Sequence, residues 1–379
     1  TIKWVTSFPN DFVEDSCDYL IITHNNFYTD PDAKSEIESL AQHRADFNGF
    51  NVVITKTSSI YSAFPDSLDM ENDEKIKELI KNTYNNGSAY HTYDGKIAYV
   101  NLFGDVDLWN GQENVPTHYQ DPDHGGYDIY YTQLTYDSIA GNYDPYPDIM
   151  IGRCSVDTIT QVQNVVHKIL HYKPDTLSWK DKMMNIVGTN LNDGEDDVSN
   201  ALLTLDEINH DTYTMKIAIP DEFQEPRPTW DTISYNADSI EKCYEGGHLF
   251  LNYLGHGTPG GWQSPLYDYT QIPDKPTYNF PFIISSACFT GAFQNYDIED
   301  CHGERLLCSD STKGAIGFIG ATKMSVWPSM ELVPLYHKAI FDNFSVVSGE
   351  ALMESKISIY RTGENWIEHY NLLGDPALN

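Results

Sequence analysis

The sequence predicts an α/β fold in which helices cover both faces of mostly parallel sheets. Short runs rich in β-branched and aromatic residues alternate along the chain with longer segments of helical periodicity. Several of the short runs are apolar throughout, which is typical of strands buried on both faces. The alternation restarts after the polar segment 173–178, so two tandem subdomains are expected, over residues 1–178 and 179–379.

The first subdomain is expected to alternate four strands with three helices. Each strand is a short β-rich run bounded by turn-forming residues. The last helix carries Val162, Val165 and Ile169 on one face, which predicts that this face packs on a sheet. The expected strands are 19–23, 51–55, 96–103 and 149–152, and the expected helices are 32–46, 72–84 and 158–172.

The second subdomain is expected to repeat this pattern around two central apolar strands, which end near residues 255 and 287. No close internal sequence repeat relates the two subdomains. The other expected elements are strands at 183–188, 213–219 and 315–320, and helices at 197–209, 238–244, 303–308, 332–344 and 349–360.

The two central apolar runs each end at a reactive residue, His256 and Cys288. The roughly 30 residues between them leave room for one crossover between neighbouring parallel strands. The carboxyl ends of such strands lie at the same edge of the sheet, which is where ligands bind in open α/β folds. Glycines flank His256, and the small Ala287 precedes Cys288, so the backbone at both points can be approached closely. Either residue alone is more often structural. A thiol beside an imidazole, however, is suited to nucleophilic attack on a carbonyl.

The composition excludes several classes of partner. The 56 acidic residues against 23 basic residues give a formal charge of −33, which disfavours nucleic acid and anionic membranes. This charge is compatible with a soluble, self-repelling surface, or with attraction of calcium and basic peptides. No apolar stretch approaches the roughly 18 residues of a membrane span, so no membrane insertion is expected. Six cysteines without a Cys-x-x-Cys spacing indicate neither a zinc site nor a disulfide scaffold.

The segment 105–146 is rich in aspartate, glycine and tyrosine and lacks clear periodicity. Loops of this length are usually functional or metal-stabilised. Carboxylate oxygens suit calcium, although the spacing here matches no EF-hand loop, and an acidic surface loop is the alternative. The candidate ligands are Asp105, Asp107, Asp121, Asp123, Asp128 and Asp148.

The chain resembles the gingipain family of secreted cysteine peptidases, which belong to the caspase-like clan. The residues that carry the resemblance are Gly255-His256-Gly257 with Trp262, Ala287-Cys288, Gly152-Arg153 after an apolar run, Trp327 in a Gly-Ala-Thr-Lys-Met-Ser-Val-Trp segment, and the closing Gly374-Asp375-Pro376. The matches run in the family's order from about residue 90 to the end of the chain. The resemblance implies a caspase-like three-layer α/β/α fold, a structural calcium ion and secretion. Because the chain begins at Thr1, removal of a targeting segment or propeptide is also expected.

The same resemblance, with the chemistry of thiol catalysis, assigns roles at the site. Cys288 is the nucleophile and His256 protonates the departing amine, so the chemistry requires no cofactor. The backbone N–H groups of Gly257 and Cys288 are candidate oxyanion donors. Asn190 stands where relatives supply an acidic residue that orients the imidazole, and Asp193 is the alternative.

Specificity is expected to depend on Asp197, which aligns with the carboxylate that arginine-specific relatives place at the base of the S1 pocket. The surrounding acidic residues are also good helix N-terminal residues, so a structural role is the alternative. Met330 stands where lysine-specific relatives place an acid, which makes lysine the second choice. The other expected pocket residues are Trp327, which stacks on the substrate side chain, Leu254, Ser286 and, as a wall of the cleft, Trp262.

These expectations describe a cysteine endopeptidase that acts on proteins and peptides after arginine, and less readily after lysine. Two alternatives remain. A transpeptidase or sortase would pass the acyl group to an amine instead of water. A non-catalytic peptide-binding module would retain the fold without the chemistry.

Overall fold

The computed structural model describes most of the chain. The side chains of 195–200, 214–215, 230–233, 243 and 327–328 lie outside this description. The described residues are 1–64, 69–86, 97–106, 114–119, 125–172, 181–188, 195–208, 214–218, 230–233, 236–263, 265–272, 280–294, 298–342 and 347–379.

Twelve of the described strands form one continuous sheet rather than two separate sheets, and the others form a three-stranded and a two-stranded sheet. All pairings in the large sheet are parallel except that between β16 and β17. In spatial order the strands are β1 (Ile2–Trp4), β3 (Val52–Lys56), β2 (Tyr19–Thr23), β4 (Tyr99–Phe103), β7 (Met150–Cys154), β17 (Tyr370–Leu373), β16 (Gly317–Ala321), β15 (Phe282–Ser286), β11 (Phe250–Gly255), β8 (Lys182–Gly188), β9 (Thr214–Ala218) and β10 (Trp230–Ile233).

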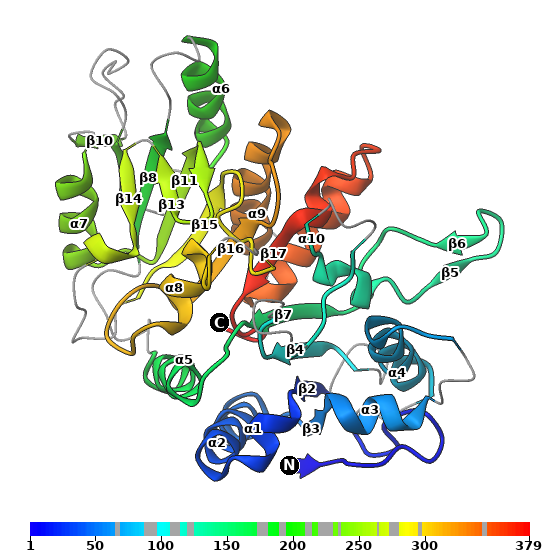
Figure 1. Ribbon diagram of the computed structural model, residues 1–379. Coiled ribbons are helices and arrows are strands. Elements are labelled where there is room, and N and C mark those ends of the chain that lie inside the picture. Colours follow the sequence, from blue (N-terminus) through cyan, green and yellow to red (C-terminus); the bar gives the residue numbers. More distant parts are fainter. Residues whose placement is uncertain are drawn as a thin grey trace.

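Helices cover both faces of the sheet (Figure 1). In the first half α2 packs against α5 on one face, while α3 packs against α4. Helix α5 also contacts α8 of the second half, where α9 contacts both α10 and α6. The helices are α1 (Asn25–Thr29), α2 (Pro31–Asn48), α3 (Thr57–Ala63), α4 (Asn72–Asn86), α5 (Ile159–His171), α6 (Glu195–Asp206), α7 (Ala237–Gly246), α8 (His302–Cys308), α9 (Leu332–Phe341) and α10 (Ser348–Tyr360). In the described part of the chain, none of these is long and apolar enough to cross a bilayer.

Local sequence signals explain where the longest helices begin and end. The Asp30 carboxylate accepts from the backbone N–H of Asp32 and Ala33 at 3.0 Å, which caps α2. That helix ends at Gly49, whose φ of 76° is readily reached by glycine. A capping box between Thr158 and Gln161 begins α5. The predicted helices 32–46 and 158–172 therefore agree with α2 and α5.

The C-terminal strand β17 joins the two halves of the sheet (Figure 1, red). It runs antiparallel to β16 and pairs with β7 through Leu373 opposite Arg153. The sequence did not predict this strand, because its short run carries no clear alternation. β17 lies between strands of both halves, so the sheet itself shows no boundary between subdomains. The division of the chain at residue 178 therefore stays a prediction.

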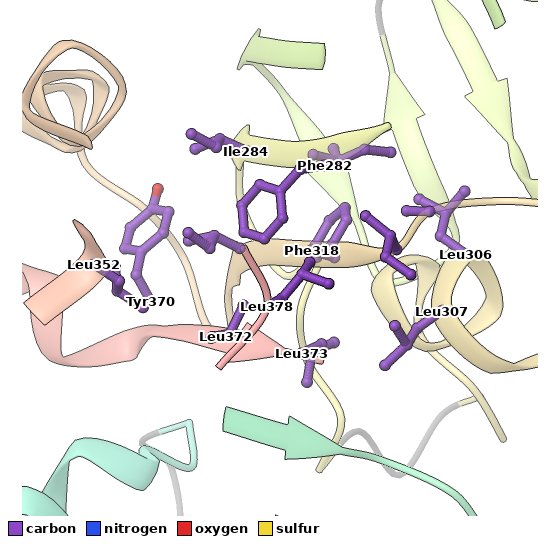
Figure 2. Packing of buried hydrophobic residues seen from close by; sticks show 14 of the residues in the cluster. Phe282, Ile284, Leu306, Leu307, Phe318, Leu352, Tyr370, Leu372, Leu373 and Leu378 are labelled. Carbon is purple, nitrogen blue, oxygen red and sulfur yellow. The ribbon is translucent and has the colours of Figure 1, made fainter. Parts of the chain in front are cut away.

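Apolar side chains around β17 form the centre of the core (Figure 2). The labelled ones come from β15, β16, β17, helices α8 and α10 and the end of the chain, and the buried cluster that contains them continues into β7 of the first half with Met150 and Cys154. The labelled side chains are Phe282, Ile284, Leu306, Leu307, Phe318, Leu352, Tyr370, Leu372, Leu373 and Leu378.

Candidate active site

Neighbouring strands bring His256 and Cys288 together. β11 and β15 are adjacent and parallel, with Leu254 opposite Ser286. His256 and Cys288 each lie two residues beyond that pair, so they stand at equivalent positions at the carboxyl edge of the sheet. Both line one cavity of about 280 Å³. The remaining lining residues are Gly255, Ser286, Ser325, Val326, Ser329 and Met330.

Two glycines allow the His256 turn to approach its neighbours. A Cβ on Gly255 would lie 1.8 Å from the carbonyl oxygen of Gly188, so only glycine fits where β11 meets β8. A Cβ on Gly257 would lie 2.8 Å from the carbonyl oxygen of Cys288, so glycine also permits close contact between the turns at His256 and Cys288. The Tyr253 hydroxyl donates to the His256 carbonyl at 2.7 Å, which holds this turn in place.

The backbone N–H of Gly257 points away from the small sheet formed by β12 (Gly257–Thr258), β13 (Gly261–Gln263) and β14 (Leu266–Asp268). Gly257 is opposite Trp262 in this antiparallel sheet. The Gln263 N–H donates to the His256 carbonyl at 3.1 Å. In an antiparallel ladder this bond makes Gly257 and Trp262 a non-hydrogen-bonded pair, whose N–H groups point away from each other's strand. The Gly257 N–H is therefore not used by β13.

A sharp turn presents the thiol of Cys288. The next residue, Phe289, has φ of 60°, a left-handed conformation that costs about 1–2 kcal/mol in a residue with a side chain. Its N–H donates to the Lys323 carbonyl at 3.1 Å. The N–H of Ser325 lies 3.3 Å from Sγ of Cys288. The segment 323–326 thus lies directly beside the thiol of Cys288.

Exposure distinguishes Cys288 from the other cysteines whose side chains are described. Cys288 is partly exposed, whereas Cys17, Cys154, Cys301 and Cys308 are buried. Burial raises the pKa of each of those four thiols well above its usual value. They are therefore poor candidates for a nucleophile.

Three serine hydroxyls in the cavity that Cys288 and His256 share are linked to one another and to the hydroxyl of Tyr370. Ser286 Oγ lies 3.0 Å from Ser329 Oγ, which is 2.6 Å from Ser325 Oγ. Ser325 Oγ is in turn 2.5 Å from the Tyr370 hydroxyl. Of these residues the sequence singled out only Ser286. Ser325 and Ser329 lie two residues before and after Trp327, so the segment around this tryptophan could have indicated them as site residues. Nothing in the sequence indicated Tyr370, because β17 was not predicted.

Some of the residues predicted to determine specificity line the cavity, and the side chains of others are not described. Met330 and Ser286 line the cavity. Asp197 lies in the first turn of α6, and Trp327 begins a 3-10 helix, Trp327–Glu331, but their side chains are outside the described part. Asn190 and Asp193 also lie outside the described residues. No carboxylate is among the described residues that line the cavity.

Two expected pocket residues do not reach the cavity, so their assignments were wrong. The indole of Trp262 is fully buried, stacks on Tyr253 at 4.5 Å and donates from Nε1 to Ser285 Oγ at 3.0 Å. It packs against Tyr253 of β11 and Ser285 of β15 instead of lining the cavity. Leu254 is also fully buried, within the core of β11.

The three described aspartates among those predicted to bind calcium do not share a site. Asp128 makes a buried ion pair with Arg153, at 2.7 Å between Nε and Oδ2. Asp105 accepts from Ser155, and Asp148 accepts from the backbone of its own loop. No group of three acidic, histidine or cysteine side chains suited to a metal is found among the described residues. Asp107, Asp121 and Asp123 lie outside them.

A partly exposed thiol and an imidazole, at the ends of adjacent parallel strands in a helix-covered sheet, define the class of caspase-like cysteine peptidases. Comparison with known sequences makes the assignment specific. The family model described as peptidase family C25 matches residues 13–379, and the chain belongs to this family.

Solved structures confirm the predicted caspase-like fold. The Arg specific cysteine proteinase gingipain R has a TM-score of 0.69, 19% identity, and an alignment over 97% of this chain and 78% of that one. The complex of pro- and mature domains of RgpB from Porphyromonas gingivalis also gives a TM-score of 0.69, at 18% identity, over 95% of this chain and 79% of that one. At such identities the likeness establishes the fold alone.

Curated relatives are similar over part of the chain. Lys-gingipain HG66 of Porphyromonas gingivalis is 26% identical over 261 residues, which cover 66% of this chain and 13% of that protein. Gingipain R2 of Porphyromonas gingivalis (strain ATCC BAA-308 / W83) is 23% identical over 263 residues, which cover 64% of this chain and 34% of the relative. The aligned region is therefore about a third or less of either relative.

Proposed function

We propose that this chain is an endopeptidase that cleaves peptide bonds through a thioester on Cys288. The observation that carries the proposal is the shared cavity of Cys288 and His256 at equivalent ends of β11 and β15. Membership of peptidase family C25 supports it independently.

The chemistry follows from this pair. Sγ of Cys288 attacks the carbonyl carbon, and the C–N bond breaks as His256 gives a proton to the departing amine. Water then attacks the thioester, the C–S bond breaks, and the acid product leaves as the thiol regains a proton. The N–H groups of Gly257 and Cys288 stabilise the intermediate oxyanion. The proposal also includes Asn190 or Asp193 as the residue that accepts a hydrogen bond from the His256 imidazole and orients it.

We further propose arginine, and less readily lysine, before the cleaved bond (P1). The relatives include a Lys-gingipain and the Arg specific gingipain R. Because the described lining is free of carboxylates, selection by charge must come from elsewhere, and Asp197 on α6 is the candidate. A carboxylate that pairs with a guanidinium in two hydrogen bonds discriminates strongly. The hydroxyls of Ser286 and Ser329 would accept further hydrogen bonds from the same side chain.

Chemical labelling and cleavage test the catalytic assignment together. Wild type, Cys288→Ala and the control Cys17→Ala are treated with an arginyl chloromethylketone and assayed on peptides with arginine or lysine at P1. Wild type and Cys17→Ala should be labelled at Cys288 and active, whereas Cys288→Ala should lose at least about 10⁴-fold in kcat/KM. Labelling at another cysteine, or activity in Cys288→Ala, would refute the assignment.

Asp197→Ala tests the pocket. The kcat/KM ratio of arginine to leucine at P1 should fall by about 100-fold or more, because the buried cation loses its partner. Asp206→Ala, at the other end of α6, is the control. An unchanged ratio in Asp197→Ala means that another residue selects the substrate.

Secretion, release from a propeptide and stabilisation by calcium are proposed on family membership alone. The calcium proposal predicts that a chelator lowers the melting temperature and that added calcium restores it. Equal melting temperatures with and without chelator would reject it.

A further inference from the structure

Thr290 lies where the turn that carries Cys288 meets the segment after His256. It is fully buried and follows Cys288 by two residues. Its methyl group faces Gly257, because a Cβ added to that glycine would lie 2.6 Å from Thr290 Cγ2. Thr290 therefore belongs to one segment and packs against the other.

A row of buried hydrogen bonds connects the small antiparallel sheet to this turn. Trp262 of β13 donates from Nε1 to Ser285 Oγ at 3.0 Å. Ser285 Oγ lies 2.9 Å from Thr290 Oγ1, and the Thr290 hydroxyl donates to the Ala287 carbonyl at 3.4 Å. Because an indole N–H can only donate and a carbonyl can only accept, the Ser285 hydroxyl donates to Thr290. The row therefore has one direction and ends at the carbonyl directly before Cys288.

A second connection runs through the backbone of α8. Two consecutive N–H groups in its first turn donate to different segments. His302 donates to the Pro259 carbonyl at 2.6 Å, and Gly303 donates to the Thr290 carbonyl at 2.9 Å. Pro259 follows β12, and Thr290 follows β15, so the beginning of one helix holds both segments.

The relative position of these segments matters for the cleavage of an amide. In the proposed mechanism His256 protonates the departing amine while Sγ of Cys288 bonds to the acyl carbon. Proton transfer requires hydrogen-bond distance, so a displacement of about 1 Å can cost about 100-fold in rate. A p-nitrophenyl ester does not need this proton, because nitrophenolate leaves without it. The two kinds of substrate therefore respond differently when the imidazole moves relative to the sulfur.

We propose that Thr290 is a positioning residue that fixes the imidazole of His256 relative to the sulfur of Cys288. The proposal rests on the proposed endopeptidase function. Thr290 is fully buried and is not among the described residues that line the cavity, so it acts through the two segments and not on the substrate. Its hydroxyl continues the row from Trp262 and its carbonyl accepts from α8, so both connections meet at this residue.

A peptidyl amide and a p-nitrophenyl ester with the same acyl part test the proposal. Thr290→Val removes the hydroxyl and keeps the shape of the side chain, so kcat/KM for the amide should fall about ten-fold or more. The kcat/KM for the ester, and the rate at which iodoacetamide alkylates Cys288, should fall less than about two-fold, because neither needs a proton from His256. Thr290→Ser retains the hydroxyl and should keep most of the amide activity.

A control and a second variant accompany these measurements. Thr23→Val is the control, because the equally buried Thr23 hydroxyl on β2 donates to the Phe103 carbonyl at 2.9 Å, in the first half of the chain. It should leave the rates for both substrates unchanged. Ser285→Ala interrupts the same row at another residue, so it should also lower amide cleavage selectively. This variant decides the question if Thr290→Val does not fold.

Two results would overturn the proposal. The first is an equal loss for amide and ester in the variants that fold, which would mean that the row supports the sulfur or the fold in general. The second is amide cleavage by these variants at the rate of Thr23→Val. A folded wild type that cleaves neither substrate would instead refute the proposed function itself, and the positioning role with it.

Discussion

The N–H of Ser325 is 3.3 Å from Sγ of Cys288, so the loop after β16 contacts this thiol directly. The hydroxyl of the same serine is 2.5 Å from that of Tyr370 on β17. Tyr370 of the C-terminal strand is therefore connected to the sulfur through a single intervening residue, Ser325. The strand that joins the two halves of the sheet also supports the segment beside Cys288.

Tyr370→Phe should lower kcat with little change in KM or melting temperature. The hydroxyl positions Ser325, and loss of one hydrogen bond worth about 1 kcal/mol corresponds to roughly a five-fold fall in rate. Tyr360→Phe is a matched control, because the buried Tyr360 hydroxyl has no hydrogen-bond partner within the described part of the chain. A change confined to KM would show that the tyrosine acts in substrate binding instead.

Gly257→Ala should lose about 100-fold in kcat/KM. The added Cβ would lie 2.6 Å from Thr290 Cγ2 and 2.8 Å from the Cys288 carbonyl oxygen, so the two catalytic turns must separate. Gly260→Ala in the same loop is the control, since its Cβ would meet nothing closer than 3.8 Å. Equal activity of the two variants would mean that the spacing of the turns is unimportant.

Asp375→Ala should destabilise the fold by about 3–5 kcal/mol, because it leaves the buried Arg44 without its partner. Arg44 Nε donates to Asp375 at 2.8 Å, and the Tyr19 hydroxyl donates to the same carboxylate at 2.8 Å. These contacts attach the end of the chain to its first α/β units. In the control, Asp15→Ala breaks the exposed pair with Lys3 and should cost under about 1 kcal/mol. Urea unfolding measures both, and similar losses would contradict the argument.

The features predicted correctly from the sequence are those that depend on short stretches of the chain. His256 and Cys288 follow apolar runs, and these runs predicted adjacent strands and hence a shared edge. Tyr370 was missed because β17 is a strand only through its pairing with β16 and β7, far away in the sequence. Trp262 was misassigned because closeness to His256 in sequence says nothing about which face the indole takes.

The sequence also does not show which charged residues pair with each other. A carboxylate in an irregular loop indicates a possible calcium ligand, and Asp128 was selected on that ground. Its partner is Arg153 instead, which also donates to the carbonyl oxygens of Gly104 and Val115. The sequence singled out both Asp128 and Arg153, but only the fold shows that each neutralises the other.

A buried pair of carboxyl groups predicts a pH dependence of stability. Ser155 Oγ lies 2.8 Å from Asp105 Oδ1 and 2.7 Å from Glu304 Oε1, and so connects β4, β7 and α8. Burial raises the pKa of Asp105 to about 6, although Ser155 and Arg153 oppose the shift. Burial, followed by the charges of Asp105 and Asp300, raises the pKa of Glu304 well above its usual value.

Because these acids hold protons more tightly when folded, the folded state binds more protons than the unfolded state above about pH 4. Their contribution to the free energy of unfolding is therefore largest at low pH, and it falls as the pH rises through 6. Glu304→Gln keeps a neutral group at this position, so the variant should lose less stability than wild type between pH 5 and pH 8. Glu350→Gln, on the distant helix α10, is the control. Urea unfolding at both pH values measures the difference, and parallel losses in wild type and Glu304→Gln would show that the pair does not titrate in this range.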